Sequence, residues 1–271
     1  MRLSLINITL LTVLCFAFLL SCEEPEDIDE ATVPVPTAAK ITDEVKEQFR
    51  SLGFDPSDLA RRGDDYLVEG DMLISPETLS DILAKETTLG NGPVGEQYHS
   101  GRLVKIGRSV RTITVRPTDD GPRFVKAISR AISNFNRLDL GFRMKRVPVG
   151  SSSDIVVSRL EKTDKNETAL ARARYPSGGR PGYRVDVYAE TFRNGYTDDF
   201  IEGLITHELG HCVGLAHTNW RARGEGGSGF QFIPGTAETD NQSIMNALIP
   251  IRTDGEFSAG DRKALRTIYP R

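Results

Sequence analysis

The chain has 271 residues, of which 38% are hydrophobic and 27% are charged, a composition typical of a soluble globular protein with one or two domains. Acidic residues outnumber basic ones by four, since Asp and Glu total 38 against 34 Lys and Arg. This mild negative charge offers no extended basic surface, so nucleic acid is not expected as a partner.

Residues 1–22 have the pattern of an export signal. Arg2 is followed by a largely apolar run from Leu3 to Leu20, and the segment ends in "LLSC". These features are typical of a signal peptide, although a run of this length could also span a bilayer as an anchor. "LLSC" resembles the lipobox of bacterial lipoproteins. The resemblance implies that Cys22 becomes the lipidated first residue of an exported lipoprotein of the bacterial cell envelope, at the outer membrane or the cell surface.

Residues 23–37, "EEPEDIDEATVPVPT", are acidic, contain proline and have too few apolar residues to fold, which predicts a tether. Contact with the membrane is expected through lipid on Cys22 only. If Cys15 leaves with the signal, only Cys212 remains, so the mature chain has no disulfide. Its stability then depends on a hydrophobic core and on any metal that it binds.

Residues 38–108 predict a small N-terminal segment. Helices are expected over 41–52 and over 75–86, where Ser75 is the N-cap and Pro76 lies in the first turn. Between them "DDYLVEGDMLIS" alternates weakly and indicates a strand. The following "LGNGPVG" indicates a linker or an exposed loop.

Residues 109–271 have a more regular pattern and predict a second domain. A helix is expected over 123–138, where apolar side chains recur at helical spacing, and another begins near Asp199. The order strand, helix, four strands, helix implies helices packed on a mixed sheet. The expected strands cover 111–117, 142–149, 154–160, 170–176 and 183–190.

The string "HELGHCVGLAH", residues 207–217, holds three of the four histidines of the chain. His207 and His211 lie four residues apart on the expected helix, so both rings project from one face and can bind one zinc ion. Glu208 is turned toward a metal-bound water, the place of a general base. Gly214 can end the helix and turn the chain back, which brings His217 to the metal as the third ligand.

A chance string on a structural helix is the alternative, but the full H-E-x-x-H-x-x-G-x-x-H pattern is far rarer than H-E-x-x-H alone. Cys212 is expected to be a small core residue and not a ligand. His99, the fourth histidine, is expected at the surface. The glycine-rich residues 223–230 form either a mobile rim over the site or a loose loop.

The histidine pattern resembles that of the metzincin zinc endopeptidases. This resemblance implies a zincin-like α+β fold with a twisted, mixed five-stranded sheet, a backing helix and an active-site helix. It also implies a C-terminal subdomain with a methionine turn beneath the metal, at Met245 in "NQSIMNAL", and a closing helix in "FSAGDRKALRTIYP". "HTNW" and "PGTAETDNQSIMNA" resemble the bacterial HEIGH-type dual-action metallopeptidases. Thr218 and Ala247 depart from astacins and serralysins, so neither subfamily is supported.

The activity implied is that of a zinc-dependent endopeptidase, which hydrolyses protein or peptide substrates with a metal-activated water and Glu208 as general base. By analogy, the substrate lies extended along the edge strand 170–176. "NALIPIRTD" after Met245 would line an apolar specificity pocket, whereas Arg172 and Arg174 could instead favour acidic residues.

Three questions stay open from the sequence. Residues 38–108 are either a propeptide, with a carboxylate such as Asp71 blocking the metal, or a structural support. The chain could also be a surface binding protein with a structural zinc, although no fourth ligand is obvious, or a hydrolase of non-peptide amides. The substrate, the maturation site and the oligomeric state are not determined, and a monomer is expected.

Overall fold

The computed structural model describes residues 41–271 except residues 53, 55, 87–96, 164–167, 219–230 and 238–239. The predicted signal, Cys22 and the tether therefore lie outside the described residues, as do residues 223–230. Residues 38–271 form one compact unit. Within the described part of this unit, every helix is too short or too polar to cross a bilayer.

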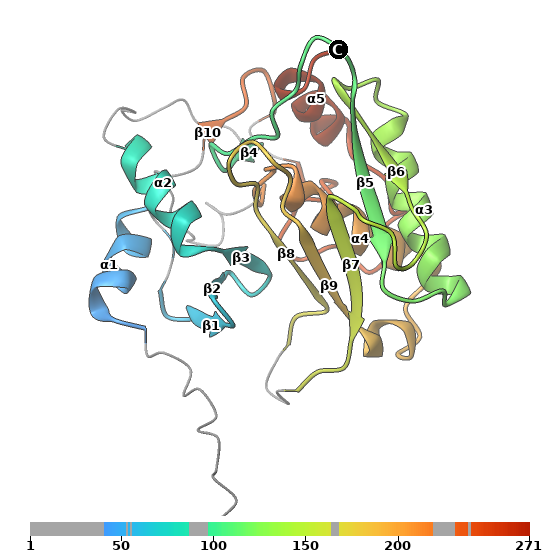
Figure 1. The fold of residues 1–271 in the computed structure, drawn as a ribbon, viewed down its shortest axis with the longest axis horizontal. Helices are drawn as coiled ribbons and strands as arrows, with labels where there is room; N and C mark the ends of the chain where they lie inside the picture. The colour runs from blue at the N-terminus through green and yellow to red at the C-terminus, as the bar shows by residue number, and fades with distance from the viewer. Residues whose placement is uncertain are drawn as a thin grey trace, which may run out of the picture. The chain divides into compact units, whose positions relative to one another are not determined.

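A single twisted sheet of eight strands forms the centre, in the order β1-β2-β3-β8-β9-β7-β5-β6 (Figure 1). Strands β5, β6, β7 and β9 are parallel to one another, whereas β8 is antiparallel to β9. The strands are β1 (Ala60–Arg62), β2 (Asp65–Val68), β3 (Met72–Ile74), β5 (Arg111–Pro117), β6 (Phe142–Arg146), β7 (Ile155–Leu160), β8 (Ala171–Arg174) and β9 (Arg184–Tyr188). A small separate pair joins β4 (Tyr98–His99) to β10 (Gln231–Phe232).

The expected mixed sheet is present, but the expected total of five strands is wrong. The five strands β8-β9-β7-β5-β6 come from the region after residue 108, and the hairpin β2–β3 with β1 extends them. The hairpin strands are buried and, except for Asp65, consist of apolar or aromatic residues. The pairing of β3 with β8 covers the edge that β8 would otherwise expose to water.

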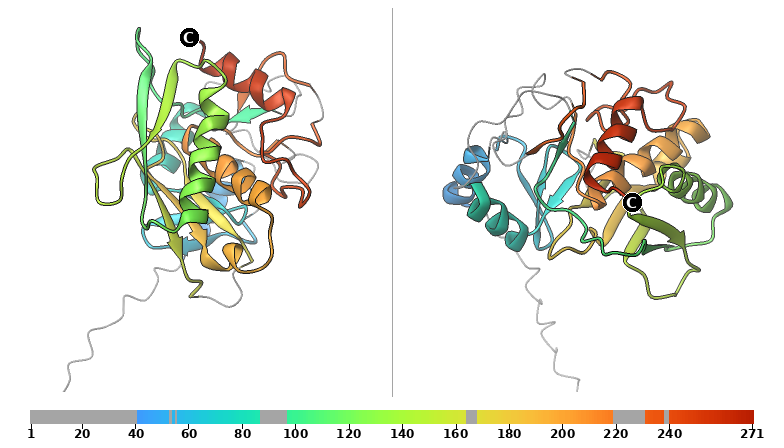
Figure 2. Two further views of the ribbon diagram at one scale, coloured as in Figure 1. Left: turned by 90° about the vertical axis from the view of Figure 1, so that its right-hand side faces the viewer. Right: turned by 90° about the horizontal axis from the view of Figure 1, so that it is seen from above.

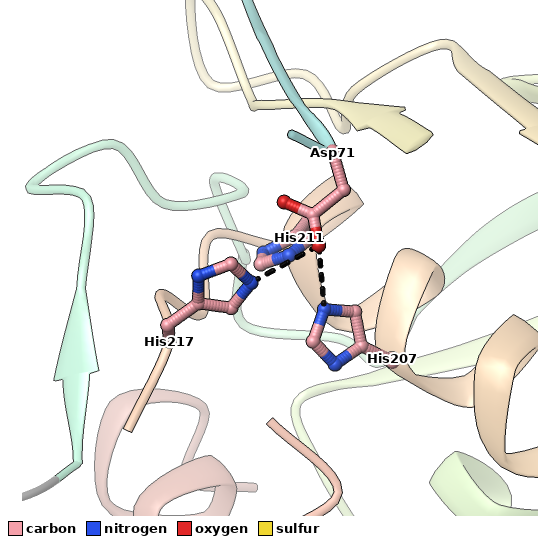
Figure 3. A group of neighbouring side chains, drawn as sticks. All are labelled: Asp71, His207, His211 and His217. Carbon is pink, nitrogen blue, oxygen red and sulfur yellow. Dashed lines mark hydrogen bonds and ion pairs between the residues drawn. The ribbon is translucent and has the colours of Figure 1, made fainter. Parts of the chain in front are cut away.

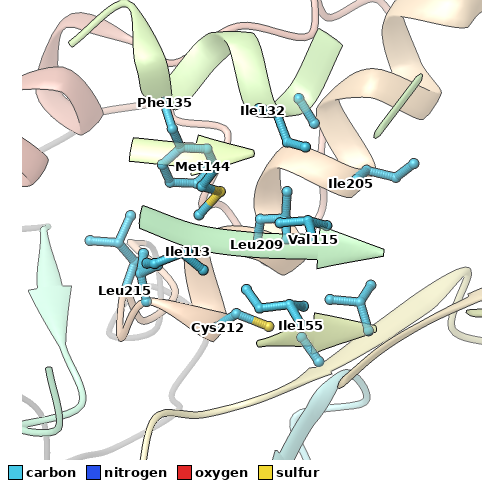
Figure 4. Packing of buried hydrophobic residues seen from close by; sticks show 14 of the residues in the cluster. Ile113, Val115, Ile132, Phe135, Met144, Ile155, Ile205, Leu209, Cys212 and Leu215 are labelled. Carbon is cyan, nitrogen blue, oxygen red and sulfur yellow. The ribbon is translucent and has the colours of Figure 1, made fainter. Parts of the chain in front are cut away.

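Two helices, α3 (Pro122–Asn136) and α4 (Asp198–Cys212), pack side by side over one face of this sheet (Figure 2). The apolar residues of α3 recur at helical spacing and are buried. Alternate residues of the strands face the helices, and Figure 4 shows Ile113, Val115 and Ile155 of the sheet close to Leu209 and Cys212 of α4. Cys212 thus belongs to the core and is not one of the side chains that converge on the possible metal position.

A second, smaller core joins the N-terminal segment to the rest of the chain. Helices α1 (Asp43–Ser51) and α2 (Pro76–Glu86) contribute Phe49, Leu79 and Ile82, and the hairpin contributes further apolar residues. Tyr175 and Ala216, from beyond residue 108, belong to the same cluster. The shared core fixes the hairpin against the region that carries the histidines.

Strand β8, which contains most of the expected substrate edge, is not an edge strand. Strand β3 pairs with it in parallel, with Met72 opposite Ala173 and Leu73 opposite Arg174 (Figure 1). The guanidinium groups of Arg172 and Arg174, which were the alternative source of specificity, form ion pairs within the sheet. Arg172 Nε donates to Asp186 Oδ2 at 3.1 Å, and Arg174 forms an ion pair with Asp65.

Candidate metal centre

Helix α4 carries three of the predicted site residues into the interior. Thr197 caps its first turn by accepting a hydrogen bond from a backbone amide. The sheet and α3 cover one side of the helix, and residues of the C-terminal region cover another. His207, Glu208 and His211 are therefore at most 1% exposed.

The three imidazole rings converge on one point together with Asp71 (Figure 3). The ring centroids of His207 and His211 lie 4.5 Å apart, and that of His217 lies 5.2 and 5.0 Å from them. One ligand atom from each of the four side chains lies within 4.8 Å of the others. Three imidazole nitrogens and one carboxylate oxygen are a ligand set that zinc accepts readily.

Each ring is oriented by the hydrogen bond of its outer nitrogen. His207 Nδ1 donates to the Ile244 carbonyl at 2.7 Å, and His211 Nδ1 donates to the Leu215 carbonyl at 2.9 Å. Because a carbonyl oxygen only accepts, the proton lies on Nδ1 and the lone pair of Nε2 faces the centre. Both of these Nε2 atoms are buried without a hydrogen-bond partner in the described chain, which is costly unless a cation binds there.

Residues 69–71 form the turn between β2 and β3, and both acidic side chains of this turn reach His217. Asp71 Oδ2 lies 3.2 Å from His217 Nε2 and 3.6 Å from His207 Nε2, while Glu69 Oε2 lies 3.0 Å from His217 Nδ1. Burial opposes ionisation of Asp71, but the surrounding histidines hold the pKa of its carboxyl far below the usual value. Among the described residues after 108, only the three histidines belong to the cluster that could hold a metal; the N-terminal segment supplies the fourth member, Asp71.

Glu208 lies beside His207 with its carboxylate in the same buried space. Its Oε2 has no hydrogen-bond partner among the described residues. Burial, and then the nearby negative charge of Asp71, raise the pKa of Glu208 well above its ordinary value. A carboxyl group with a raised pKa holds and releases a proton closer to neutral pH, as a general base requires.

Gly214 reverses the chain between the second and third histidines. Its φ is +102°, and a β-carbon at this position would lie 2.4 Å from the Arg102 carbonyl oxygen. The Ser100 amide donates to the Gly214 carbonyl, so this turn is held by the residue that directly follows β4. The sharp turn brings His217 back to the face of α4 that carries the other two rings.

Replacing Gly214 by alanine is expected to destabilise the fold by more than the ~1–2 kcal/mol that a left-handed backbone costs an L-residue, because the new methyl group also meets Arg102. Gly195→Ala is the matched control, since its φ is +73° but nothing lies within 4 Å of the added carbon. Urea unfolding of both variants measures the difference. Equal losses would show that the contact with Arg102 carries no cost.

Met245 is buried and packs against the active-site helix. A β-carbon on Gly210 would lie 2.6 Å from the Met245 sulfur, so only glycine allows this close approach. The Met245 carbonyl accepts a hydrogen bond from the Thr218 amide, next to the third histidine. The methionine therefore supports the helix and the loop that together carry the three rings.

The turn around Met245 is anchored by the C-terminal helix α5 (Ala259–Ile268). Asp261 accepts hydrogen bonds from Ser243 Oγ at 2.6 Å and from the Ile244 amide at 2.8 Å. The same carboxylate accepts from the Ser258 amide and completes the capping box of α5. Asp261 thus holds the residue whose carbonyl orients His207.

Residues 66–269 match the family described as the dual-action HEIGH metallo-peptidases, and this match covers more than half of the chain. The chain belongs to this family. It is accordingly a zinc-dependent peptidase, and its substrates are proteins or peptides. The resemblance of the "HTNW" and methionine-turn segments to HEIGH-type metallopeptidases is confirmed. No curated protein sequence gives a significant match.

Solved structures show weak likeness to the peptidase. A structure of myroilysin is 15% identical, covers 65% of this chain and 98% of its own, and has a TM-score of 0.45. A crystal structure of myroilysin is 17% identical, covers 64% and 89%, and has a TM-score of 0.43. High choriolytic enzyme 1, a hatching-enzyme zinc-protease from Oryzias latipes, is 18% identical, covers 65% and 98%, and has a TM-score of 0.36. These structural similarities support no assignment of function beyond the family membership.

A pocket of about 500 Å³ opens beside the metal centre of the peptidase. His207, Glu208 and Asp71 lie on its wall. The segment after Met245 contributes Leu248 and Ile251, which are 76% and 70% exposed and thus border open space instead of a packed core. The other apolar side chains of the pocket are Ala169, Leu170, Ala171, Tyr196, Phe200, Leu204, Ala247 and Ile249.

Three residues that support the metal centre could not be predicted from the histidine motif. Tyr175, directly after β8, donates to the Leu215 carbonyl at 2.9 Å, and its hydroxyl lies 3.1 Å from His211 Nδ1. Glu69 and Asp261 contact His217 and the methionine turn from opposite ends of the chain. Of the three, only Asp261 has a local sequence signal, because it lies three residues after the N-cap of a helix.

Proposed function

We propose that the protein is an endopeptidase that cleaves peptide bonds with a water activated at the metal centre. The observation that carries this proposal is that the three imidazole rings converge beside the buried carboxylate of Glu208, whose Oε2 has no hydrogen-bond partner in the part of the chain that the structure describes. His207, His211 and His217 would hold the zinc ion through Nε2. Gly214 forms the turn that returns His217 to the other two rings, and Met245 packs against the helix that carries His207 and His211.

Zinc, when bound, supplies the Lewis acidity that makes water a nucleophile near neutral pH. Glu208 accepts the proton of the attacking water at its carboxylate and delivers it to the amine of the leaving peptide. Its raised pKa, caused by burial first, suits both steps. No tyrosine follows Met245 at position 247, so the developing oxyanion depends on the metal centre and on backbone groups.

The apolar pocket beside Glu208 supports a preference for peptides with a large hydrophobic side chain next to the scissile bond. Its aromatic and aliphatic lining matches such a group in size and polarity. The pairing of β8 with β3 begins at Ala173, whereas Leu170 and Ala171 border the pocket. The extended substrate would therefore use the first half of β8. Selection of acidic residues by Arg172 or Arg174 has no support, because both guanidinium groups are paired within the sheet.

The arrangement described here is, we propose, a latent form of the enzyme. Asp71 supplies a carboxylate oxygen as a fourth ligand where a catalytic zinc site keeps one position open for water and substrate. Activity then requires this side chain to withdraw from the centre. The N-terminal segment would thus supply, through the turn between β2 and β3, the side chain that closes the centre.

A surface binding protein with a structural zinc is the second candidate, and Asp71 is the observation that favours it. Four protein ligands around one zinc ion are typical of structural sites. The two candidates differ in what Glu208 does, because a structural site does not require a buried carboxylate whose Oε2 lacks a hydrogen-bond partner among the described residues.

Export and a lipid on Cys22 remain proposals supported by the sequence of residues 1–22. An exported peptidase tethered by residues 23–37 would act on proteins at the bacterial cell surface or in the envelope. Metabolic labelling with a clickable fatty acid tests the anchor. We expect the wild-type chain to carry label and Cys22→Ser to lose it.

The enzymatic proposal is tested by zinc analysis and digestion of a peptide library with residues 38–271, the unit that is compact by itself. We expect about one zinc per chain and slow cleavage beside large apolar residues. Cleavage that persists without zinc would contradict the enzymatic proposal. So would a result in which residues 38–271 and their Asp71→Asn variant both bind zinc but cleave no peptide.

A further inference from the structure

The turn at residues 69–71 contacts both nitrogens of His217. On the inner side, Asp71 Oδ2 lies 3.2 Å from Nε2, in the space that the metal would share. On the outer side, Glu69 Oε2 lies 3.0 Å from Nδ1, and the Glu69 side chain is only 3% exposed. One three-residue turn thus supplies a group that closes the metal centre and a group that lies behind a ligand.

The outer partner of His217 differs from those of the other two histidines. His207 and His211 donate to backbone carbonyls of Ile244 and Leu215, which belong to the same region of the chain as the rings themselves. His217 alone among the three has a carboxylate behind it, and this carboxylate comes from 148 residues earlier in the sequence. A carboxylate acceptor fixes the ring and makes the imidazole a stronger ligand.

The backbone conformation at Glu69 is unfavourable for glutamate, which indicates that this residue is present for its side chain and not for the turn. Its φ is +52°, a left-handed conformation that costs an L-residue roughly 1–2 kcal/mol. Tight hairpin turns normally place Asn, Asp or Gly at such positions. A glutamate held there, with Val68 and Met72 buried on either side of the turn, points to a function for its carboxylate.

We propose that Glu69 is a positioning residue for His217, so that the β2–β3 hairpin is a permanent part of the metal centre. The inference rests on the proposed zinc site and extends it. Glu69 and Asp71 then have opposite effects: the first strengthens zinc binding, and the second closes the centre. Opening requires only that Asp71 withdraws, while the hairpin and Glu69 stay in place.

The zinc affinity of the apo protein, measured by competition with a chromogenic chelator, tests this role. Glu69→Gly removes the carboxylate and also relieves the left-handed backbone, so the apo protein should be no less stable than wild type. We expect its zinc dissociation constant to rise about 10- to 100-fold, the usual effect of losing such a partner. Glu69→Gln keeps an acceptor oxygen and should restore part of the affinity. Glu44→Gln, on the exposed face of α1, is the matched control and should bind zinc as wild type does.

Thermal unfolding of the apo variants separates positioning from a structural role, and the absorption spectrum of the cobalt-substituted protein reports the ligand geometry. A Glu69→Gly variant with unchanged zinc affinity and an unchanged cobalt spectrum would overturn the inference, whatever its stability. If wild type itself bound no zinc, the proposed metal centre would be wrong. If wild type bound zinc and Glu69→Gly bound it equally well, only the role of Glu69 would be wrong.

Discussion

Replacing Glu208 by alanine is expected to remove peptide cleavage while leaving zinc bound. Glu208 lies beside the imidazole cluster but is not among the four side chains that converge on the metal position. Loss of a general base typically lowers turnover by about 10²- to 10⁴-fold. Turnover of a fluorogenic peptide and zinc content of the same preparation measure the two effects.

Two variants make this result specific. Glu208→Gln keeps the size of the side chain and should be as inactive as Glu208→Ala, because an amide cannot accept the proton. Glu161→Ala removes an exposed carboxylate that pairs with Arg193 at the surface, and it should leave turnover unchanged. If the Glu208 variants kept wild-type turnover, Glu208 would have no part in the chemistry, and the structural-zinc alternative or another base would have to be considered.

Asp71→Asn is expected to increase peptide cleavage by the full chain. The substitution removes the negative charge that holds the centre closed and keeps the shape of the side chain. A gain of roughly 100-fold corresponds to release of a closed state favoured by about 2.7 kcal/mol. Initial rates with a peptide that carries a large apolar residue measure the gain, with Asp43→Asn, an exposed residue of α1, as the control.

The Asp71 result also separates the two candidate functions. An enzyme whose metal centre is closed by Asp71 gains activity when this interaction is weakened. Combining Asp71→Asn with Glu208→Ala should abolish that gain. A protein with a structural zinc gains nothing and instead loses metal, because its fourth ligand is weakened. Zinc retained near one equivalent, with no cleavage by the single variant, would contradict the latent form.

Much of the fold follows from periodicity in the sequence. The strand at 111–117 and the helix around Phe124–Phe135 have side chains that alternate or recur at the spacing of their element, and the structure has them where expected. The pairing of β3 with β8 could not be predicted in this way. Strand β3 has only three residues, too few to define a period, and its partner lies about 100 residues later in the sequence.

In the candidate site, too, local spacing in the sequence predicts some residues, whereas others depend on contacts between distant parts of the chain. Helical spacing predicts that His207 and His211 share a face, and a glycine turn predicts the return of His217. Glu69 could not be assigned from the sequence, because its role depends on a contact across 148 residues. Asp71 could be named only as one candidate carboxylate, since nothing local distinguishes it from other acidic residues of the N-terminal segment.

The anchoring of the methionine turn by Asp261 has a consequence for the order of events during biosynthesis. The carbonyl that orients His207 belongs to Ile244, and the amide of Ile244 is held by a carboxylate in the first turn of the last helix. A growing polypeptide that ends before this helix lacks that support. The nascent chain therefore cannot complete its catalytic centre until helix α5 has been synthesised and has packed against the methionine turn, which delays hydrolysis at least until that point.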